Sequence, residues 1–485
     1  MSGSDLIAST QAILPLVILV IWACVLLLLD VFFLKQRSTI TAALAALGLL
    51  VALGFVVARF GTTISGFGGM VVADNFSNFL NLLILTSGLA GVALAYDYLR
   101  RTGVDKGEYY ILLLFAIVGM MLMGMSADLI MIFLALELLS IPLYVLAGIA
   151  APRLTSEEAA IKYFLLGAFS SGFFVYGTAL VFGATGTTAL RNIMAVVGVG
   201  QYDSTLLLIG GALVLVGLGF KVALVPFHMW TPDVYHGAPS AVTAFMAVGA
   251  KAAGFAALLR IFVLAFPLLS VDFTPILWTL AALTMVIGNV VAIAQRNIKR
   301  LLAYSSIAHA GYILMALVPY GNQAVSADSV ASALFYLVAY AFTNFAAWST
   351  VIALEQAGEK GLNLENYAGL GRKNPALAAV MAVAMLSFTG VPPTLGFFGK
   401  FYLFRTVVEG GFIGLALIGV FTSLISAYYY LRVIVVMYMQ DGEPVVHYEP
   451  WLYLTAYGAA AGTVLLSIFS LPLLTWATRA ILEVF

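Results

Sequence analysis

Charged side chains are scarce in this sequence. Only 9% of its 485 residues are Asp, Glu, Lys or Arg, whereas 63% are hydrophobic; soluble domains carry roughly 25% charged residues. The few charges also balance, at 22 acidic and 22 basic residues, so no positive excess indicates a nucleic-acid partner. The composition excludes an ordinary soluble domain and favours a chain whose main solvent is the lipid bilayer.

Cysteine is nearly absent, and the histidines are few and scattered. The lone thiol, Cys24, can form neither a disulfide framework nor the ligand set of an iron–sulfur cluster. The histidines show no helical pairing, which predicts no metal or haem site. We therefore expect no cofactor on this chain, and any electron transfer in its system should take place elsewhere. The four histidines are His228, His236, His309 and His447.

Long apolar stretches recur from end to end, and about 20 apolar residues are needed for a helix to cross the hydrocarbon core. The first stretch, Ile13 to Leu34, is too long for a signal-peptide core, so we expect a retained helix. The linkers are short, and the longest polar one, about Glu355 to Asn374, is too small to be a domain. The sequence predicts an all-α polytopic membrane protein, with residues 1–485 in a single membrane domain of about fourteen transmembrane helices. The predicted spans are 11–34, 39–58, 76–97, 109–126, 128–150, 160–184, 205–227, 239–263, 275–295, 300–319, 327–355, 375–403, 411–439 and 451–480.

Lys and Arg gather at one end of these predicted helices. Because basic residues are retained in short cytoplasmic loops, that end is predicted to face the cytoplasm. With an even number of helices, both termini should then lie outside. The basic end has Lys35, Arg37, Arg100, Arg101, Lys106, Arg153, Arg296, Lys299, Arg300, Lys360, Arg372 and Lys373, and the opposite end Arg59, Arg191, Arg260, Arg405 and Arg479.

Two predicted helices contain prolines that should break them. The seventh includes GLGFKVALVPFHMWTPDVYHGAP, and the twelfth includes LSFTGVPPTLGFFGKF, in which Pro392 and Pro393 lie among glycines. Each proline removes an amide donor and disrupts the helical backbone. Discontinuous helices in corresponding positions of two halves indicate a transporter site built from repeats.

Ionisable side chains lie inside the predicted spans. Glu137 is near mid-span in SADLIMIFLALELLSIPLY, Lys221 and Lys400 belong to the two broken helices, and Lys251 is central in SAVTAFMAVGAKAAGFAALLR. A charge in a span costs about 2.5 to 3.5 kcal/mol on insertion scales and usually marks an ion or proton route. A buried glutamate near a lysine forms a pair whose protonation is readily switched. We predict a proton pathway through these four residues, with Glu137 opposite Lys221.

Histidine at neutral pH is a natural relay between lysines, so His228 and His309 are added to the predicted pathway. Structural interpretations stay open for several of these residues. Glu137 and Lys221 could form a static ion pair that fixes helix register. Lys400, near the end of its predicted span, could extend to the interface, and the histidines could bond backbone groups freed by the breaks. Asp128, Lys162 and Arg432 are interpreted as anchors at span boundaries.

Three segments resemble the antiporter-like membrane subunits of respiratory complex I. They are FKVALVPFHMWTPDVYHGAPSAVTAFMAVGAKAAGF, QRNIKRLLAYSSIAHAGY and LSFTGVPPTLGFFGKFYLF, and the TPDVYHGAP and GVPPTLGFFGKFY forms are most similar to subunit N. The resemblance implies two inverted five-helix repeats, residues 109–263 (helices four to eight) and 275–439 (helices nine to thirteen), each with a broken helix. The functional positions of the family fall on Glu137, Lys221, Lys251, Lys400 and His309.

The resemblance also implies a location and partners. It places the chain in the bacterial cytoplasmic (inner) membrane, within the lipid bilayer and beside other complex I membrane subunits, including neighbouring antiporter-like subunits. It implies that FMN, iron–sulfur clusters and quinone lie elsewhere in the complex. The expected function is proton translocation coupled to quinone reduction by NADH.

Three alternatives stay open. One is a subunit of a multisubunit cation/proton antiporter or membrane-bound hydrogenase, which share the broken-helix lysines. A second is a structural spacer whose buried charges only lock the assembly. A third is a free-standing solute carrier, although no substrate-shaped set of polar residues supports it.

Overall fold

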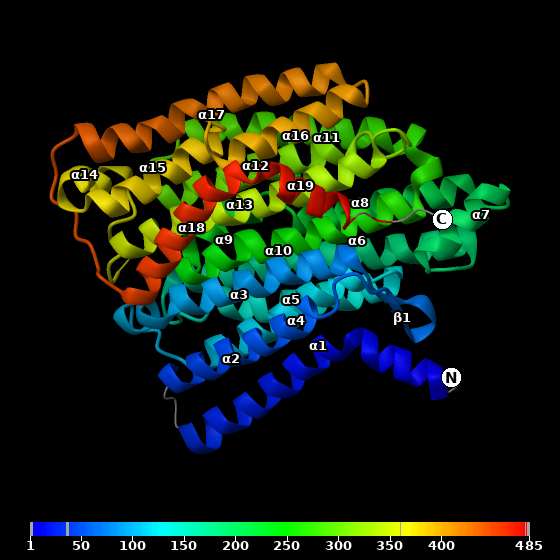
Figure 1. Cartoon of the computed structure of the whole chain (residues 1–485), viewed down its shortest axis with the longest axis horizontal. Helices are drawn as coiled ribbons and strands as arrows, with labels where there is room; N and C mark the ends of the chain where they lie inside the picture. The colour runs from blue at the N-terminus through cyan, green and yellow to red at the C-terminus, as the bar shows by residue number, and fades with distance from the viewer. Residues whose placement is uncertain (1–2, 35–37, 359, 481, 483–485) are drawn as a thin grey trace.

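The computed structural model describes residues 3–34, 38–358, 360–480 and 482. These form nineteen α-helices, most of them roughly side by side, and one small β-hairpin (Figure 1). Lys35, Arg37 and the two ends of the predicted 1–485 domain lie outside the described residues. The helices are α1 (Gly3–Leu29), α2 (Ser38–Val57), α3 (Asn75–Arg101), α4 (Glu108–Met125), α5 (Leu129–Ala147), α6 (Leu154–Thr185), α7 (Leu190–Val199), α8 (Ser204–Lys221), α9 (Trp230–Gly237), α10 (Ser240–Arg260), α11 (Ser270–Ile293), α12 (Ile298–Leu317), α13 (Ser326–Leu354), α14 (Leu370–Lys373), α15 (Pro375–Thr389), α16 (Leu395–Glu409), α17 (Ile413–Met439), α18 (Pro450–Ile468) and α19 (Ser470–Thr478).

Twelve helices of the described residues are long and apolar enough to cross a membrane. The other two predicted spans are present in a different form. The span predicted at 300–319 is α12, a 20-residue helix whose basic, hydroxyl and imidazole side chains make it more polar, and the span at 375–403 is divided between α15 and α16. The fourteen predicted segments are thus all helical. The span at 451–480 is split into α18 and α19, and the sequence reading did not include the ten-residue α7.

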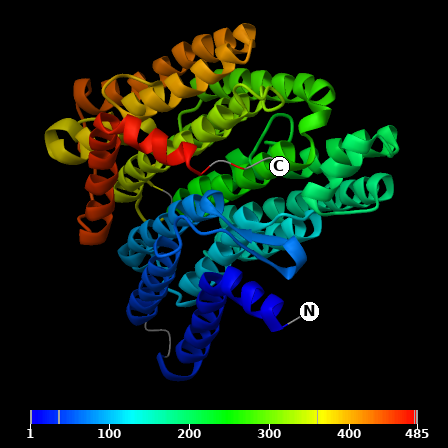
Figure 2. The same ribbon diagram turned by 45° about the vertical axis from the view of Figure 1, so that its right-hand side comes forward.

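Helices α10 and α13 form the centre of the bundle. The membrane-crossing segment that contains α10 is buried along its whole length, and α13 is buried over 94% of its most apolar window. By contrast, α1, α6 and α18 are only 33% buried and lie at the periphery (Figure 2). The alanines and glycines of α10 allow neighbouring backbones to approach closely, as small residues do between membrane helices. An ionisable group on α10 is therefore surrounded by protein, not by lipid.

Both predicted helix breaks are present. Helix α8 ends at Lys221, and α9 begins only at Trp230; α15 ends at Thr389, and α16 begins at Leu395. In the first break Ala223 has φ of 64°, a left-handed conformation that costs an L-residue about 1 to 2 kcal/mol. The surrounding packing must hold this strained segment in place. Each break leaves helix-terminal backbone groups available to side chains inside the membrane.

The ends of the helices divide into a basic and a non-basic side. Helix α1 begins at the right-hand end of Figure 1, and the hairpin that pairs β1 (Ile64–Gly66) with β2 (Val71–Ala73) lies near it. The basic residues of α14 lie at the opposite end. That both termini lie on the outer side stays a prediction.

Candidate functional site

Three lysines are buried in the interior of the bundle. Lys221, Lys251 and Lys400 are at most 4% exposed, and they belong to α8, α10 and α16. Each ammonium group lies over a tyrosine ring, which attracts a cation electrostatically. The distances from Nζ to the ring centroid are 5.3 Å for Lys221 and Tyr163, 5.7 Å for Lys251 and Tyr340, and 4.9 Å for Lys400 and Tyr312.

Lys221 contacts α5 and α6. Its Nζ donates hydrogen bonds to Ser140 Oγ at 2.8 Å and to the Tyr163 hydroxyl at 3.2 Å. Glu137 instead accepts a hydrogen bond from Ser171 of α6. Glu137 and Lys221 therefore do not form the static ion pair that the sequence left open, because the carboxylate bonds Ser171 and Ser140 occupies the position beside the lysine. The charge of Glu137 still acts on Lys221 through space.

Lys251 lies where α10, α12 and α13 meet. Its Nζ donates to the backbone carbonyl oxygen of Ser306 at 2.5 Å, and the Tyr340 hydroxyl donates to Ser306 Oγ at 2.9 Å. No ion pair to Lys251 occurs within the described part of the chain. The hydrogen-bond partners of the Lys251 ammonium group are all neutral, so no opposite charge balances it. Lys251 is therefore not held there by a static salt bridge.

His309 of α12 lies between Lys251 and Lys400, and both lysines act on its imidazole electrostatically. Its Nδ1 shares a hydrogen bond of 2.6 Å with the Tyr336 hydroxyl, and its Nε2 one of 3.1 Å with the Tyr430 hydroxyl. The ring is 3% exposed. The imidazole is thus placed to receive a proton on one nitrogen and release it from the other.

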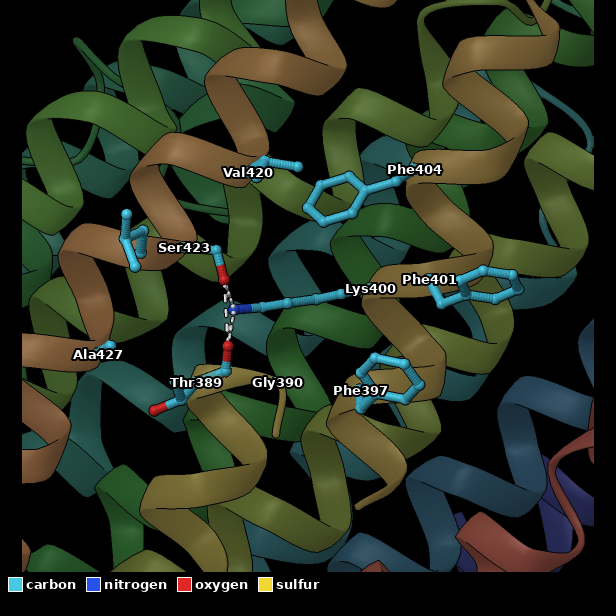
Figure 3. A pocket seen from close by; sticks show the side chains of 10 residues that line it. Thr389, Gly390, Phe397, Lys400, Phe401, Phe404, Val420, Ser423 and Ala427 are labelled. Atoms are coloured by element: carbon cyan, nitrogen blue, oxygen red, sulfur yellow. Dashed lines mark hydrogen bonds between the residues drawn. The ribbon is translucent and has the colours of Figure 1, made fainter. Parts of the chain in front are cut away.

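Lys400 points from α16 back to the end of α15 (Figure 3). Its Nζ donates to the backbone carbonyl oxygens of Phe388 at 2.8 Å and Thr389 at 3.0 Å, and to Ser423 Oγ at 2.6 Å. The last carbonyls of a helix lack partners and carry partial negative charge, so they suit an ammonium group. The interpretation of Lys400 as a side chain extending to the interface is therefore wrong: the residue lies in the second turn of α16 and is 4% exposed.

Gly390 makes room for this lysine. Its φ is +90°, and a Cβ added to it would lie 3.0 Å from Lys400 Cδ. Any other residue would meet both backbone strain and a close contact. The lysine also borders a cavity of about 330 Å³, which it shares with Phe401 and Phe404 (Figure 3).

His228 is separate from this network. It lies in the break between α8 and α9, is 7% exposed, and its Nδ1 has no hydrogen-bond partner among the described residues. No hydrogen bond joins it to the three lysines among the described residues. Asp128, Lys162 and Arg432, interpreted as anchors, each make a local contact. Asp128 caps α5, Lys162 pairs with Asp233 at 2.7 Å, and Arg432 donates to the backbone carbonyl oxygens of Ile293 and Gln295.

The hydroxyl groups that lie among these side chains were not predicted from the sequence. A signal for them was present: Tyr336 and Tyr340 are one turn apart in α13, and Ser305 and His309 one turn apart in α12, so each pair shares a helix face. The hydroxyl-bearing residues of the network are Ser140, Tyr163, Ser171, Ser305, Ser306, Tyr312, Tyr336, Tyr340, Ser423 and Tyr430.

A helical membrane bundle with two broken helices and buried lysines linked by hydroxyl and imidazole groups defines an antiporter-like membrane protein. Residues 126–426 match the family model described as NADH:quinone oxidoreductase/Mrp antiporter, transmembrane. The chain belongs to this family and, within it, to the NADH-quinone oxidoreductase subunit N group.

The similarity to known proteins extends over nearly the whole chain. NADH-quinone oxidoreductase subunit N of Chloroflexus aggregans is 47% identical over 473 residues, which cover 96% of each protein. A chain of respiratory complex I from Thermus thermophilus is 37% identical, with a TM-score of 0.83 over 96% of this chain and 99% of that one. A chain of the Mrp complex from a Dietzia species has a TM-score of 0.85 over 98% and 97%, and at 20% identity it shows a shared fold alone.

Proposed function

We propose that this chain translocates protons as a membrane subunit of an NADH:quinone oxidoreductase. The observation that carries the proposal is a buried cluster of hydroxyl and imidazole groups between Lys251 and Lys400. Ser306 accepts hydrogen bonds from Lys251 and Tyr340. The His309 ring packs against the Tyr340 ring and is hydrogen-bonded to two further tyrosine hydroxyls. Fixed hydroxyl and imidazole groups pass protons by short rearrangements of their hydrogen bonds. The similarity to subunit N of other bacteria supports the same activity.

Two segments make up the proposed route. The first contains Glu137, Ser140 and Lys221, where α5 meets α8, and the second contains Lys251, His309 and Lys400. A change in the charge of one residue alters the proton affinity of the next, because buried charges are weakly screened. We assign Glu137, Lys221, Lys251, Lys400 and His309 to the pathway. His228 is kept as a residue of the first break that would join the pathway only if water links it to Lys221.

The redox chemistry is proposed to take place on other subunits. The chain itself would hold no redox cofactor, and FMN, the iron–sulfur clusters and quinone would be bound elsewhere in the complex. The role of this chain in the enzyme is then to use the conformational or electrostatic change that quinone reduction produces. We also propose that residues 109–263 and 275–439 are inverted repeats, each contributing one broken helix.

Exposed apolar faces at both ends of the route indicate contacts with other subunits. On α5 and α6 the exposed residues flank the half-buried Glu137, and on α16 and α17 they flank the cavity at Lys400. Other membrane subunits of complex I, including antiporter-like ones, would cover these faces so that a charge change crosses the interface. The exposed residues include Leu134, Ile141, Phe169, Phe401, Phe421 and Leu424.

The basic end is proposed to face the cytoplasm, in the inner membrane, with both termini outside. The first experiment is to purify the tagged chain in mild detergent and assay NADH oxidation by a quinone analogue. Activity together with flavin and iron–sulfur spectra supports the proposal. Colourless, inactive material that retains other membrane subunits, with sodium-dependent transport, favours a cation/proton antiporter instead.

The structural spacer is distinguished by the Lys221→Ala variant. If Lys221 only locks the assembly, the variant complex falls apart, but any intact complex moves the normal number of protons per electron. If the proposal is right, the complex assembles and fewer protons are moved per electron.

A further inference from the structure

Glu355 is a buried acid that the proposed route does not use. It caps the C-terminus of α13 and is 0% exposed, and neither of its carboxyl oxygens has a hydrogen-bond partner among the described residues. Buried polar groups are nearly always paired with protein or internal water. This acid therefore needs an explanation beyond packing.

Other buried polar groups surround it. The Tyr98 hydroxyl lies beside the carboxyl group, and Tyr367 and Glu355 act on each other electrostatically. The Tyr98 hydroxyl accepts a hydrogen bond of 3.0 Å from the Ser240 amide, while Ser240 Oγ and the Tyr367 hydroxyl are buried without partners. Two basic groups face Tyr98: Arg153, and Arg101, whose guanidinium carbon is 5.7 Å from the centre of the Tyr98 ring. Arg101 is paired with Glu449 at 3.2 Å. Several unpaired polar atoms around one carboxyl group form a site for internal water.

An acidic cavity lies on the outer side of Glu355. Its volume is about 280 Å³, and its lining includes the two residues that flank Glu355, namely Leu354 and Gln356. Glu365 and Glu443 also line it. Glu443 is paired with Lys373 at 3.1 Å, so Glu365 is the carboxylate of this lining without an ion pair among the described residues. Its charge attracts cations, including protons, to the cavity. The cavity belongs to the basic end of the bundle, the end proposed to face the cytoplasm.

On the inner side, hydroxyl-bearing residues lie between the cluster and Lys251, and the proposed route needs water to join them. Thr243 is three residues after Ser240 in α10, and its Oγ1 donates to the carbonyl oxygen of Tyr235 at 3.3 Å. The Tyr235 hydroxyl lies beside Ser306, whose carbonyl oxygen accepts the hydrogen bond from Lys251. Eleven residues separate Ser240 from Lys251, about 16 Å along a helix.

We propose that Glu355 is the proton-accepting group of an inlet that supplies Lys251 from the cytoplasmic side. The inference rests on the proposed function. The carboxylate takes a proton from water in the acidic cavity and releases it to the hydroxyl and water chain of Tyr98, Ser240 and Tyr235. The neutral amine of Lys251 accepts it. One proton is taken up at the cavity for each proton that reaches Lys251. The only bonds formed or broken are those to the transferred protons.

Four variants of the complete complex in sealed vesicles test the inlet. Glu355→Gln keeps the shape but cannot carry a proton, so protons moved per electron should fall at least threefold while NADH:quinone turnover is retained. The matched control is Glu108→Gln, a half-buried glutamate that also has an unpaired oxygen; it should pump normally. Glu355→Asp should restore part of the pumping, and Tyr98→Phe should slow it.

A second readout separates proton uptake from a structural role. In the wild type, a change of pH on the cytoplasmic side should change the pumping rate, and a redox-induced infrared band of a protonated carboxyl group should be present. Both should be absent in Glu355→Gln. If this variant does not assemble, the infrared band of Glu355→Asp should be shifted relative to the wild type.

Normal pumping in Glu355→Gln would overturn the inlet, as would an unshifted infrared band in Glu355→Asp. Lys251→Ala, measured in parallel, distinguishes failure of the inlet from failure of the proposed function. If Lys251→Ala abolishes pumping while Glu355→Gln pumps normally, only the inlet is wrong. If neither variant affects pumping, the proposed function is wrong as well.

Discussion

The ammonium group of Lys221 donates a hydrogen bond of 2.8 Å to the hydroxyl of Ser140, and not to the carboxylate of Glu137 one turn earlier in α5. A neutral partner leaves the lysine free to change its charge without breaking an ion pair. A carboxylate at a short distance can still alter that charge when it moves. The geometry is therefore compatible with the proposed change of charge at Lys221, whereas a direct salt bridge would hold both charges fixed.

Ser140→Ala tests the importance of this hydroxyl group. The variant leaves one donor of Lys221 without its partner inside the bundle, which costs about 1 to 3 kcal/mol. We expect the rate of proton pumping to fall about tenfold, the change that ~1.4 kcal/mol on a barrier produces. Ser87→Ala is the control, because the buried Ser87 hydroxyl bonds only the Leu83 carbonyl of its own helix. Equal pumping in the two variants would contradict the role of Ser140.

Gly390→Ala tests the packing of Lys400 at the second break. The added methyl group would combine a left-handed backbone, at about 1 to 2 kcal/mol, with a contact of 3.0 Å to Lys400 Cδ. We expect a lower melting temperature and weaker pumping. Gly411→Ala has a similar φ of +89° but open space around it, so it should lose stability without losing pumping. Gly414→Ala, in open space on α17, should change neither.

Tyr336→Phe tests the relay at His309. The variant keeps the ring but removes the hydroxyl that shares a 2.6 Å hydrogen bond with His309 Nδ1. We expect slower pumping and an altered effect of deuterated water on the pumping rate, measured with a pH-sensitive dye in vesicles. Tyr109→Phe removes a buried hydroxyl that has no partner, and it should pump like the wild type. If the two variants show the same isotope effect, the imidazole is not part of the route.

The helices and the lysines could be predicted from the sequence because each depends on local features. Apolar runs predicted the membrane helices, and prolines such as Pro226 and Pro392 predicted the breaks. Lys251 stood out because no acid shares its helix. These signals need no knowledge of which helices are neighbours in space.

The contacts of these residues could not be predicted in the same way. Whether Glu137 faces α6 or α8 depends on the rotation of α5 against both, which packing decides. The position of Lys400 depended on where the second break ends, and helix ends are the least certain part of a sequence reading. The tyrosines around His309 come from α13 and α17, and only the fold brings them together.

His447 predicts a pH dependence of stability at the basic end. It lies between α17 and α18, outside the membrane helices, and burial together with Arg101 lowers its pKa below the usual 6.5. The folded state therefore favours neutral imidazole, and this stability is present above pH 6.5 and is lost as the pH falls below it.

His447→Asn should thus flatten the loss of melting temperature between pH 7.5 and 5.5. Glu449, whose pKa is raised by burial, is present in both proteins and does not affect the comparison. A pH profile that is identical in the wild type and the variant would show that His447 does not contribute.

The most direct test of proton translocation is the number of protons moved per electron by the Lys251→Ala complex in sealed vesicles. Lys251 is buried in the most enclosed helix and has no ion pair to lose within the part of the chain that the structure describes, so we expect the complex to assemble. If the proposed route is right, NADH:quinone turnover continues and the proton-to-electron ratio falls. An assembled complex with the wild-type ratio would contradict it.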